Sequence, residues 1–125
     1  MKSNVVAEKS YSFSVRIVKL YLRLHEEHRW EHALFEQLLC SGTSIGANIQ
    51  EAAYAQSRKD FINKQCIALK EASETLYWLR LLTDTEFIKQ EESAKLQADC
   101  SEIIRILTAI VNSTKDKRNP EGIST

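Results

Sequence analysis

The chain has 125 residues, 43% of them hydrophobic, and its 17 basic and 17 acidic residues give a formal net charge of zero. This length and composition predict one domain with its own core. The balanced charge makes the whole chain a poor candidate for a general polyanion binder, and only three glycines and one proline disfavour a turn-rich all-β fold. No apolar run approaches the ~20 residues that a membrane-spanning helix needs.

The N-terminal residues and the cysteines are typical of a protein from a reducing compartment. The first residues, MKSNVVAEKSYS, have no apolar core of the kind found in signal peptides. Cys40, Cys66 and Cys100 are far apart and show no CxxC spacing, which favours free, buried thiols. We therefore expect a cytoplasmic protein that makes no membrane contact.

Four amphipathic segments follow one another, at about residues 5–26, 31–55, 58–82 and 91–113. In the third and fourth segments, apolar or small residues recur with the 3.6-residue period of a helix that buries one stripe. The connectors are short and polar, which favours antiparallel neighbours. The sequence predicts an all-α, antiparallel up-down-up-down four-helix bundle over residues 1–114, followed by a disordered tail at residues 115–125.

The first segment carries two apolar faces instead of one. At about 100° per residue, one face contains Val6, Phe13, Ile17, Leu20 and Leu24, and a second face contains Tyr11, Val15, Val18 and Leu22. A surface helix of a monomer needs a single apolar stripe. The second face therefore predicts a subunit interface, with a central position in an irregular bundle as the alternative.

A basic strip lies between these faces and contains Lys9, Arg16, Lys19 and Arg23. Residues 1–24 have five basic and one acidic residue, a charge of +4, whereas residues 25–53 have one basic and five acidic residues, a charge of −4. This division favours complementary packing of the first and second segments, within or between subunits. The alternative is that the four cations bind the phosphate groups of a nucleic acid.

Two glycines, Gly42 and Gly46, lie inside the second segment, in CSGTSIGANIQEA. Each costs about 1 kcal/mol of helix stability relative to alanine. A phosphate-binding loop is disfavoured, because no strand precedes the glycines and no GK[ST] sequence follows them. Small residues four apart let another helix approach closely. We predict that the two glycines form a close-packing face of a helix.

Beside the glycines, the second segment carries a polar ridge, which consists of Gln37, Ser44, Asn48 and Glu51. Helical spacing places these residues, with Ser41, within about a quarter-turn of one another. The favoured interpretation is a hydrogen-bonded network that fixes how the helix packs. The alternative is a binding site at a junction between subunits.

No combination of residues indicates catalysis, a cofactor or a resident metal. The second segment offers no nucleophile with an adjacent base, so we predict neither an enzyme nor a small-molecule substrate. The spacing of His25, His28 and His32 could suit a divalent metal on one helix, but a predicted turn interrupts it. Tyr77 and Trp78 are expected to fill the core or an interface rather than to stack on RNA bases.

The segment from residue 37 to residue 82 resembles a known family. The matching motifs are Gln-Leu-Leu at 37–39, Ser-Ile-Gly-Ala-Asn-Ile at 44–49, Glu51, Lys-Asp-Phe at 59–61 and Ala-Leu-Lys-Glu-Ala-Ser-Glu-Thr at 68–75. They resemble the bacterial four-helix bundle proteins encoded in intervening sequences of 23S ribosomal RNA. The resemblance covers roughly the whole bundle and implies the same fold that the periodicity predicts.

The resemblance also implies self-association, because related proteins form closed homopentameric rings. Another relative, the accessory variability determinant of diversity-generating retroelements, is a basic pentamer that partners a reverse transcriptase and nucleic acid. This chain departs from the pattern at Cys40 and Gln50, where relatives often carry basic residues. The loss of these cations argues against transferring nucleic-acid binding to this chain.

These observations lead to two functional hypotheses. The first is a non-enzymatic homo-oligomeric scaffold, pentameric by the resemblance, that binds a macromolecular partner. The alternative is an accessory protein that binds RNA or DNA through the basic strip. The residues leave open whether the partner is a protein or a structured nucleic acid.

Overall fold

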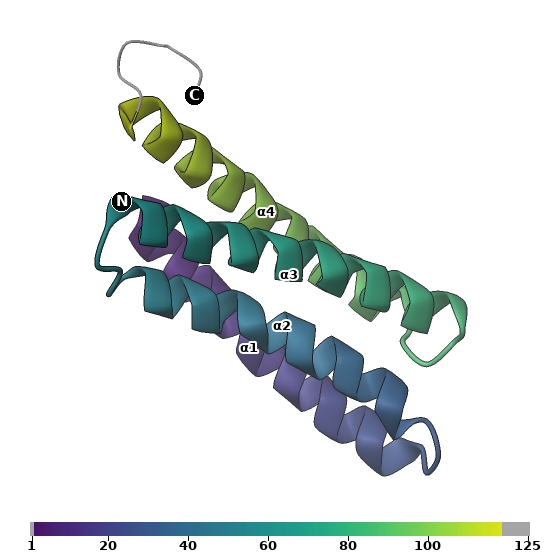
Figure 1. Ribbon diagram of the computed structural model, residues 1–125. Coiled ribbons are helices and arrows are strands. Elements are labelled where there is room, and N and C mark those ends of the chain that lie inside the picture. Colours follow the sequence, from purple (N-terminus) through teal and green to yellow (C-terminus); the bar gives the residue numbers. More distant parts are fainter. Residues whose placement is uncertain (1, 119–125) are drawn as a thin grey trace.

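The computed structural model describes residues 2–118 and contains four helices: α1 (Lys2–Glu27), α2 (His32–Ala52), α3 (Arg58–Asp84) and α4 (Gln90–Arg118). Successive helices run in opposite directions and are joined by short turns (Figure 1). The described residues contain no strand. This architecture confirms the predicted all-α, antiparallel four-helix bundle. Within residues 2–118, none of the helices combines the length and apolar character that crossing a bilayer requires.

The helix boundaries follow local chemistry. Ser57 has an extended backbone, and its hydroxyl oxygen accepts a hydrogen bond of 3.0 Å from the backbone N–H of Asp60, which caps α3. After α3 the chain passes through Glu86 in the left-handed region, at φ 70°. α4 continues to Arg118, past residue 114, the predicted end of the bundle, and residues 119–125 of the predicted tail lie outside the described residues.

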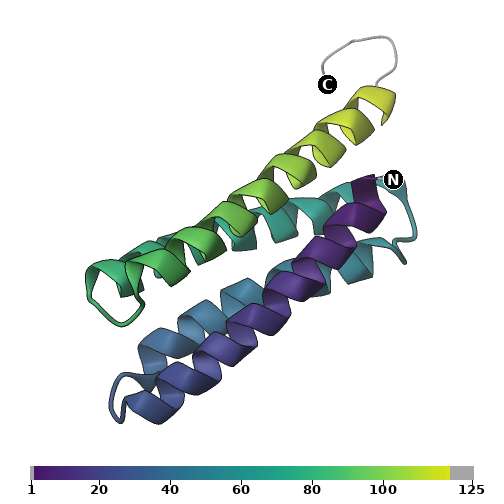
Figure 2. The ribbon, with the colours of Figure 1, turned by 180° about the vertical axis from the view of Figure 1, so that it is seen from behind.

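Each helix packs against two of the other three. The neighbouring pairs are α1–α2, α2–α3, α3–α4 and α1–α4, and the contact between α1 and α4 is the least extensive. α1 and α3 lie diagonally across the bundle, with no Cα atoms within 8 Å of each other. Figure 1 views the bundle with α3 towards the reader, and Figure 2, from behind, with α1 towards the reader. The outer surfaces of α1 and α3 therefore cannot contact each other within one bundle.

The first apolar face of α1 lies in the core, as the sequence predicts. Its members are each no more than 2% exposed, namely Val6, Phe13, Ile17, Leu20 and Leu24. The other three helices contribute further buried residues to the same cluster, among them Phe35, Leu38, Ile45, Leu79, Leu82, Leu96, Ile103 and Leu107. One side of α1 is thus fully used by the bundle, and its other surfaces remain for other contacts.

The two glycines of α2 face α1. A β-carbon added to Gly42 would lie 2.9 Å from Cγ2 of Ile17, and one added to Gly46 would lie 3.2 Å from Oγ of Ser14. A contact below 3.0 Å forces a neighbour to move, so Gly42 sets the distance at which α1 and α2 pack. The predicted close-packing role of the glycines is confirmed.

Buried hydroxyl and thiol groups connect α3 to the helices on both sides. Thr75 donates a hydrogen bond of 3.1 Å to Ser41 of α2, and Thr83 donates to Ser93 of α4. The thiol of Cys100 in α4 donates to the carbonyl of Ala72 at 3.3 Å. Burial raises the pKa of Cys100 to about 12, so this thiol is a structural group and a poor nucleophile.

Candidate interaction surfaces

The second apolar face of α1 is exposed to solvent. Tyr11 is 71% exposed, Leu22 59%, and Val15 and Val18 37% each. These four residues, called the α1 apolar strip below, recur at intervals of three and four and therefore lie on one side of the helix. An apolar row of this length is typical of a surface that another protein covers. The strip lies where a subunit interface is predicted, and that assignment stays a prediction.

The basic strip of α1 is turned towards α4. Three of its four cations form ion pairs with that helix, namely Lys9–Glu102 at 3.0 Å, Arg16–Asp99, and Arg23–Glu92 at 2.7 Å. The hydrogen bond with Glu92 raises the pKa of Arg23, and the same bond lowers the pKa of Glu92. Lys19 has no ion-pair partner among the described side chains.

The charge of α1 is thus balanced by α4 and not by α2, its predicted complement. The reason is geometric: the surface of α1 that meets α2 carries Ile17 and the serines opposite the glycines, whereas the basic strip lies on the other side. Between α1 and α4 there are two grooves, of about 330 and 220 Å³, lined in part by the paired side chains. Lys19 lines the smaller groove together with Arg16, Arg23 and Glu92.

The polar ridge of α2 does not form a network of side chains bonded to one another. Ser44 donates to the carbonyl of Cys40 at 2.6 Å, and Asn48 donates to the carbonyl of Ser44 at 2.8 Å. Glu51 reaches across to α3 and pairs with Lys64 at 2.9 Å. Gln37 is exposed. The cross-helix contact expected from the ridge is therefore made by Glu51, and by Ser41 beside it.

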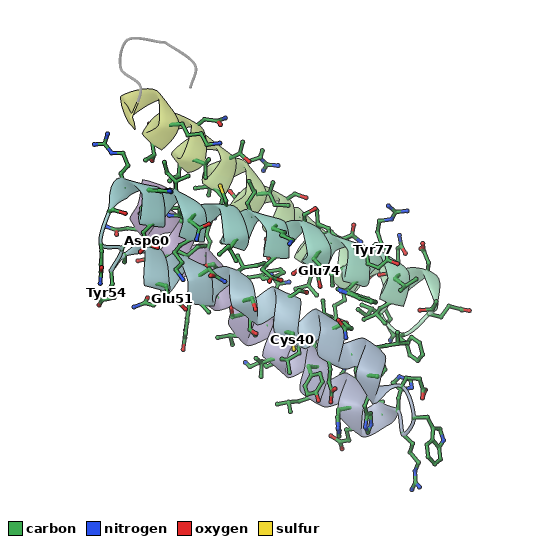
Figure 3. The ribbon with its side chains drawn as sticks, in the orientation of Figure 1. Cys40, Glu51, Tyr54, Asp60, Glu74 and Tyr77 are labelled. Atoms are coloured by element: carbon green, nitrogen blue, oxygen red, sulfur yellow. The ribbon has the colours of Figure 1, made fainter. Side chains whose placement is uncertain are left out.

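A further surface lies on the outer side of α3 and includes Tyr77 and Trp78, for which the sequence predicts a place in the core or in an interface. It is called the α3 aromatic–acidic patch below and consists of Glu71, Glu74, Tyr77 and Trp78. Tyr77 is 58% exposed, and its ring meets that of Trp78 edge to face, with centroids 5.1 Å apart. The indole nitrogen of Trp78 donates to Glu74 at 3.4 Å. Figure 3, which has α3 towards the reader, shows Glu74 and Tyr77 on this helix.

The carboxylates of this patch form no ion pair among the described side chains. Partial burial and the neighbouring charge of Glu74 raise the pKa of Glu71, although Lys70 acts in the opposite direction. Glu71, Glu74 and Trp78 share a helix side by their spacing of three and four, although this spacing does not show whether that side faces solvent.

The histidines meet across the turn between α1 and α2. The rings of His25 and His32 stack with centroids 3.7 Å apart, and His28 contacts the ring of Phe87 edge to face at 4.9 Å. The turn thus brings together two of the three histidine rings, although it was predicted to break their alignment. Among the described residues, no three His, Cys, Asp or Glu side chains are placed to hold one metal ion.

The predicted burial of the cysteines is correct for one of the three. Cys100 is buried, Cys66 is half-buried and Cys40 is exposed on α2. Cys40 occupies one of the positions at which the proteins that this chain resembles often carry a basic residue. A basic side chain at this position would also have to be exposed to solvent. The exposure of Cys40 therefore follows from its place on the outer side of α2.

Comparison with known proteins identifies the family. The sequence model for "23S rRNA-intervening sequence protein" matches residues 2–109. A crystal structure at 1.70 Å of a protein of unknown function from the S23 ribosomal protein family of Bacteroides thetaiotaomicron VPI-5482 is 52% identical. The match covers 90% of this chain and 99% of that one, with a TM-score of 0.83. No curated protein matches the chain significantly. Since the match spans the bundle from α1 into α4, the chain belongs to the family of 23S rRNA-intervening sequence proteins.

Proposed function

We propose that this protein is a non-enzymatic, homo-oligomeric helical scaffold, with five copies in the assembly, that binds a macromolecular partner. The observation that carries the proposal is the α1 apolar strip, because the bundle already has a complete core without it. Leaving such a row exposed to water is unfavourable, at roughly 25 cal/mol for each Å² of apolar surface. In an assembly of identical chains, a neighbouring copy can cover the α1 apolar strip of each chain.

The surroundings of the candidate residues support a scaffold over an enzyme. The charged side chains of the α1–α4 grooves are mostly engaged in ion pairs with one another, and the buried thiol of Cys100 has a raised pKa. General acid–base or nucleophilic chemistry needs groups poised to exchange a proton near neutral pH. The related protein from Bacteroides thetaiotaomicron is described as having unknown function.

Charge placed in the α1 apolar strip should dissociate the assembly. We expect the double variant Val15→Glu, Val18→Glu to scatter light as a single chain of 14.4 kDa, because burying unpaired carboxylates in an apolar interface costs several kcal/mol. The wild type should scatter as five times that mass. Both positions are 37% exposed in the single chain, so circular dichroism should show a helical monomer.

The matched control is Ala98→Glu, which adds a carboxylate at an exposed position of α4 and should leave the mass unchanged. A double variant that keeps the wild-type mass would show that the strip is not the interface. A wild type that is monomeric at all concentrations would contradict the oligomeric scaffold itself.

The alternative function is binding of structured RNA or DNA through the basic strip. It is supported by the charge of +4 on residues 1–24 and by the family description, which refers to 23S rRNA. The ion pairs oppose it, because a phosphate group must compete with the α4 carboxylates for Lys9, Arg16 and Arg23. We therefore place it second.

This alternative predicts a salt-dependent affinity to which Lys19 contributes. In a filter-binding titration with structured RNA, Lys19→Gln should weaken binding at low salt and reduce the slope of log affinity against log salt by about 1. Lys95→Gln, at an exposed position of α4, is the control. Absence of affinity at low salt, or affinity that survives glutamine at Arg16, Lys19 and Arg23 together, counts against nucleic-acid binding.

A further inference from the structure

Two exposed surfaces lie on different sides of the bundle. The α1 apolar strip is on the outer side of α1, and the α3 aromatic–acidic patch is on the outer side of α3. These helices are diagonal in the bundle, so their outer surfaces lie on different sides of it (Figures 1 and 2). The two surfaces cannot meet within one chain, but they can meet between two copies.

Both surfaces carry apolar side chains that can pack against each other. The strip offers two valines in its middle, between Tyr11 and Leu22. The patch offers the edge-to-face pair of Tyr77 and Trp78, rings that cover a large apolar area at low entropic cost. Aromatic side chains of this kind are enriched at the centres of protein interfaces.

The two surfaces are also complementary in charge. Lys19 follows Val18 directly, lies at the edge of the strip, and has no carboxylate partner among the described side chains. On the patch, Glu71 and Glu74 are neighbouring carboxylates that form no ion pair among the described side chains, and the pKa of Glu71 is raised by its partial burial and by Glu74. A lysine from outside the chain would relieve the repulsion between them.

We propose that the α1 apolar strip of one copy packs on the α3 aromatic–acidic patch of the next copy, with Lys19 placed between Glu71 and Glu74. The contact rests on the proposed homo-oligomer and names the surface that completes it. Because the two surfaces differ, the contact is heterologous: each copy uses its strip for one neighbour and its patch for the other. Repetition of one such contact closes into a ring when the rotation between copies allows it.

A contact of α1 with the α1 of a second copy satisfies the same observations less well. It would cover the strip on both copies, but it would bring two Lys19 side chains to one interface and leave Tyr77 exposed in every copy. Like charges across an interface are unfavourable. The head-to-tail contact pairs the cation with carboxylates and covers both surfaces.

A charge exchange tests the pairing. Lys19→Glu and Glu74→Lys should each raise the dissociation constant of the assembly about tenfold or more, because each places like charges opposite one another. The chain that carries both substitutions should regain most of the wild-type affinity, measured by light scattering over a dilution series. Lys95→Glu, at an exposed position of α4, should leave the dissociation constant unchanged. A double variant no tighter than the single ones would overturn the pairing.

Cysteine cross-linking tests the geometry separately. In a background of Cys40→Ser, oxidation of the variant Val18→Cys, Tyr77→Cys should give a ladder of covalent multimers, while each single substitution stays unlinked. Covalent dimers from Val18→Cys alone would overturn the proposal in favour of an α1–α1 contact. If the glutamates at Val15 and Val18 dissociate the assembly but the ladder is absent, the scaffold stands and this contact fails.

Discussion

Gly42→Ala is expected to lower the free energy of unfolding by about 1–2 kcal/mol, although alanine is the better helix former. The new β-carbon would lie 2.9 Å from Cγ2 and 3.1 Å from Cγ1 of Ile17. Ile17 is fully buried, and its β-branched side chain has few other rotamers in a helix. Overpacking of about 1–3 kcal/mol therefore exceeds the helix propensity gain of about 1 kcal/mol. Urea denaturation followed by circular dichroism measures the difference.

The same substitution four residues later is the matched control. At Gly46 the nearest atom to a new β-carbon is Oγ of Ser14, at 3.2 Å, and a hydroxyl can rotate at the cost of its bond to the carbonyl of Ser10. Gly46→Ala should therefore change stability by less than about 0.5 kcal/mol, with the propensity gain offsetting the contact. Equal losses at both positions would mean that glycine serves backbone conformation and not the approach of α1.

Removing the side chain of Ile17 tests whether its contact with the new β-carbon causes the destabilisation by Gly42→Ala. Ile17→Ala alone should cost about 2–5 kcal/mol because it leaves a cavity. In that background Gly42→Ala should become neutral or stabilising, since the methyl group enters space that Ile17 has vacated. A coupling of about 1 kcal/mol or more between the two sites is the expected result of the double-mutant cycle. Independent effects would contradict the close packing of α1 on α2.

The helices could be predicted from the sequence because their signals are local. Ser57 followed by Asp60 is enough to place the start of α3, and the period of Val6, Phe13 and Ile17 is enough to identify the buried side of α1. The end of α4 was harder to predict, because residues 115–118 continue the helix without any apolar period. A helix can extend beyond its packed part when nothing such as proline or glycine stops it.

The contacts between helices could be predicted only in part. The bundle topology follows from short turns, but the partner of the basic strip depends on how α1 is rotated about its axis. The glycines turn Ile17 and the serines of α1 towards α2 and thereby direct Arg16 and Arg23 towards α4. That rotation is a tertiary property, and segment charges alone suggested α2.

The two candidate surfaces also differ in how far the sequence could predict them. The α1 apolar strip was predictable because four apolar residues at helical spacing form a visible pattern, and each is exposed in the single chain. The α3 aromatic–acidic patch was predictable only in part. Its two rings were expected in the core or in an interface, but Trp78 and Glu71 are half-buried, and their spacing alone does not show which side of α3 faces solvent. The like-charged pair of Glu71 and Glu74 becomes informative once the structure shows that neither carboxylate has an ion-pair partner among the described side chains.

Phe35→Ala is expected to cost about 3–5 kcal/mol, the largest single loss considered for this bundle. Phe35 is fully buried near the start of α2. Its ring lies 5.3 Å from that of Phe87 and 5.5 Å from that of His28, measured between centroids. These three rings join the α1–α2 turn to the α3–α4 turn, since His28 also meets Phe87. Removing the ring of Phe35 creates a cavity and also eliminates its contacts with the rings of Phe87 and His28.

Trp30→Ala is the matched control for Phe35→Ala, because it removes an exposed aromatic ring at the same end of the bundle. Trp30 is larger than Phe35 and lies five residues away, but it is 86% exposed, so its removal should change stability by less than about 0.5 kcal/mol. Hydrogen exchange should also speed up in Phe35→Ala at both turns, because a ring shared by two turns couples their opening. If exchange rises only at the α1–α2 turn, the aromatic cluster does not connect the two halves of the bundle, and Phe35 acts only within α2.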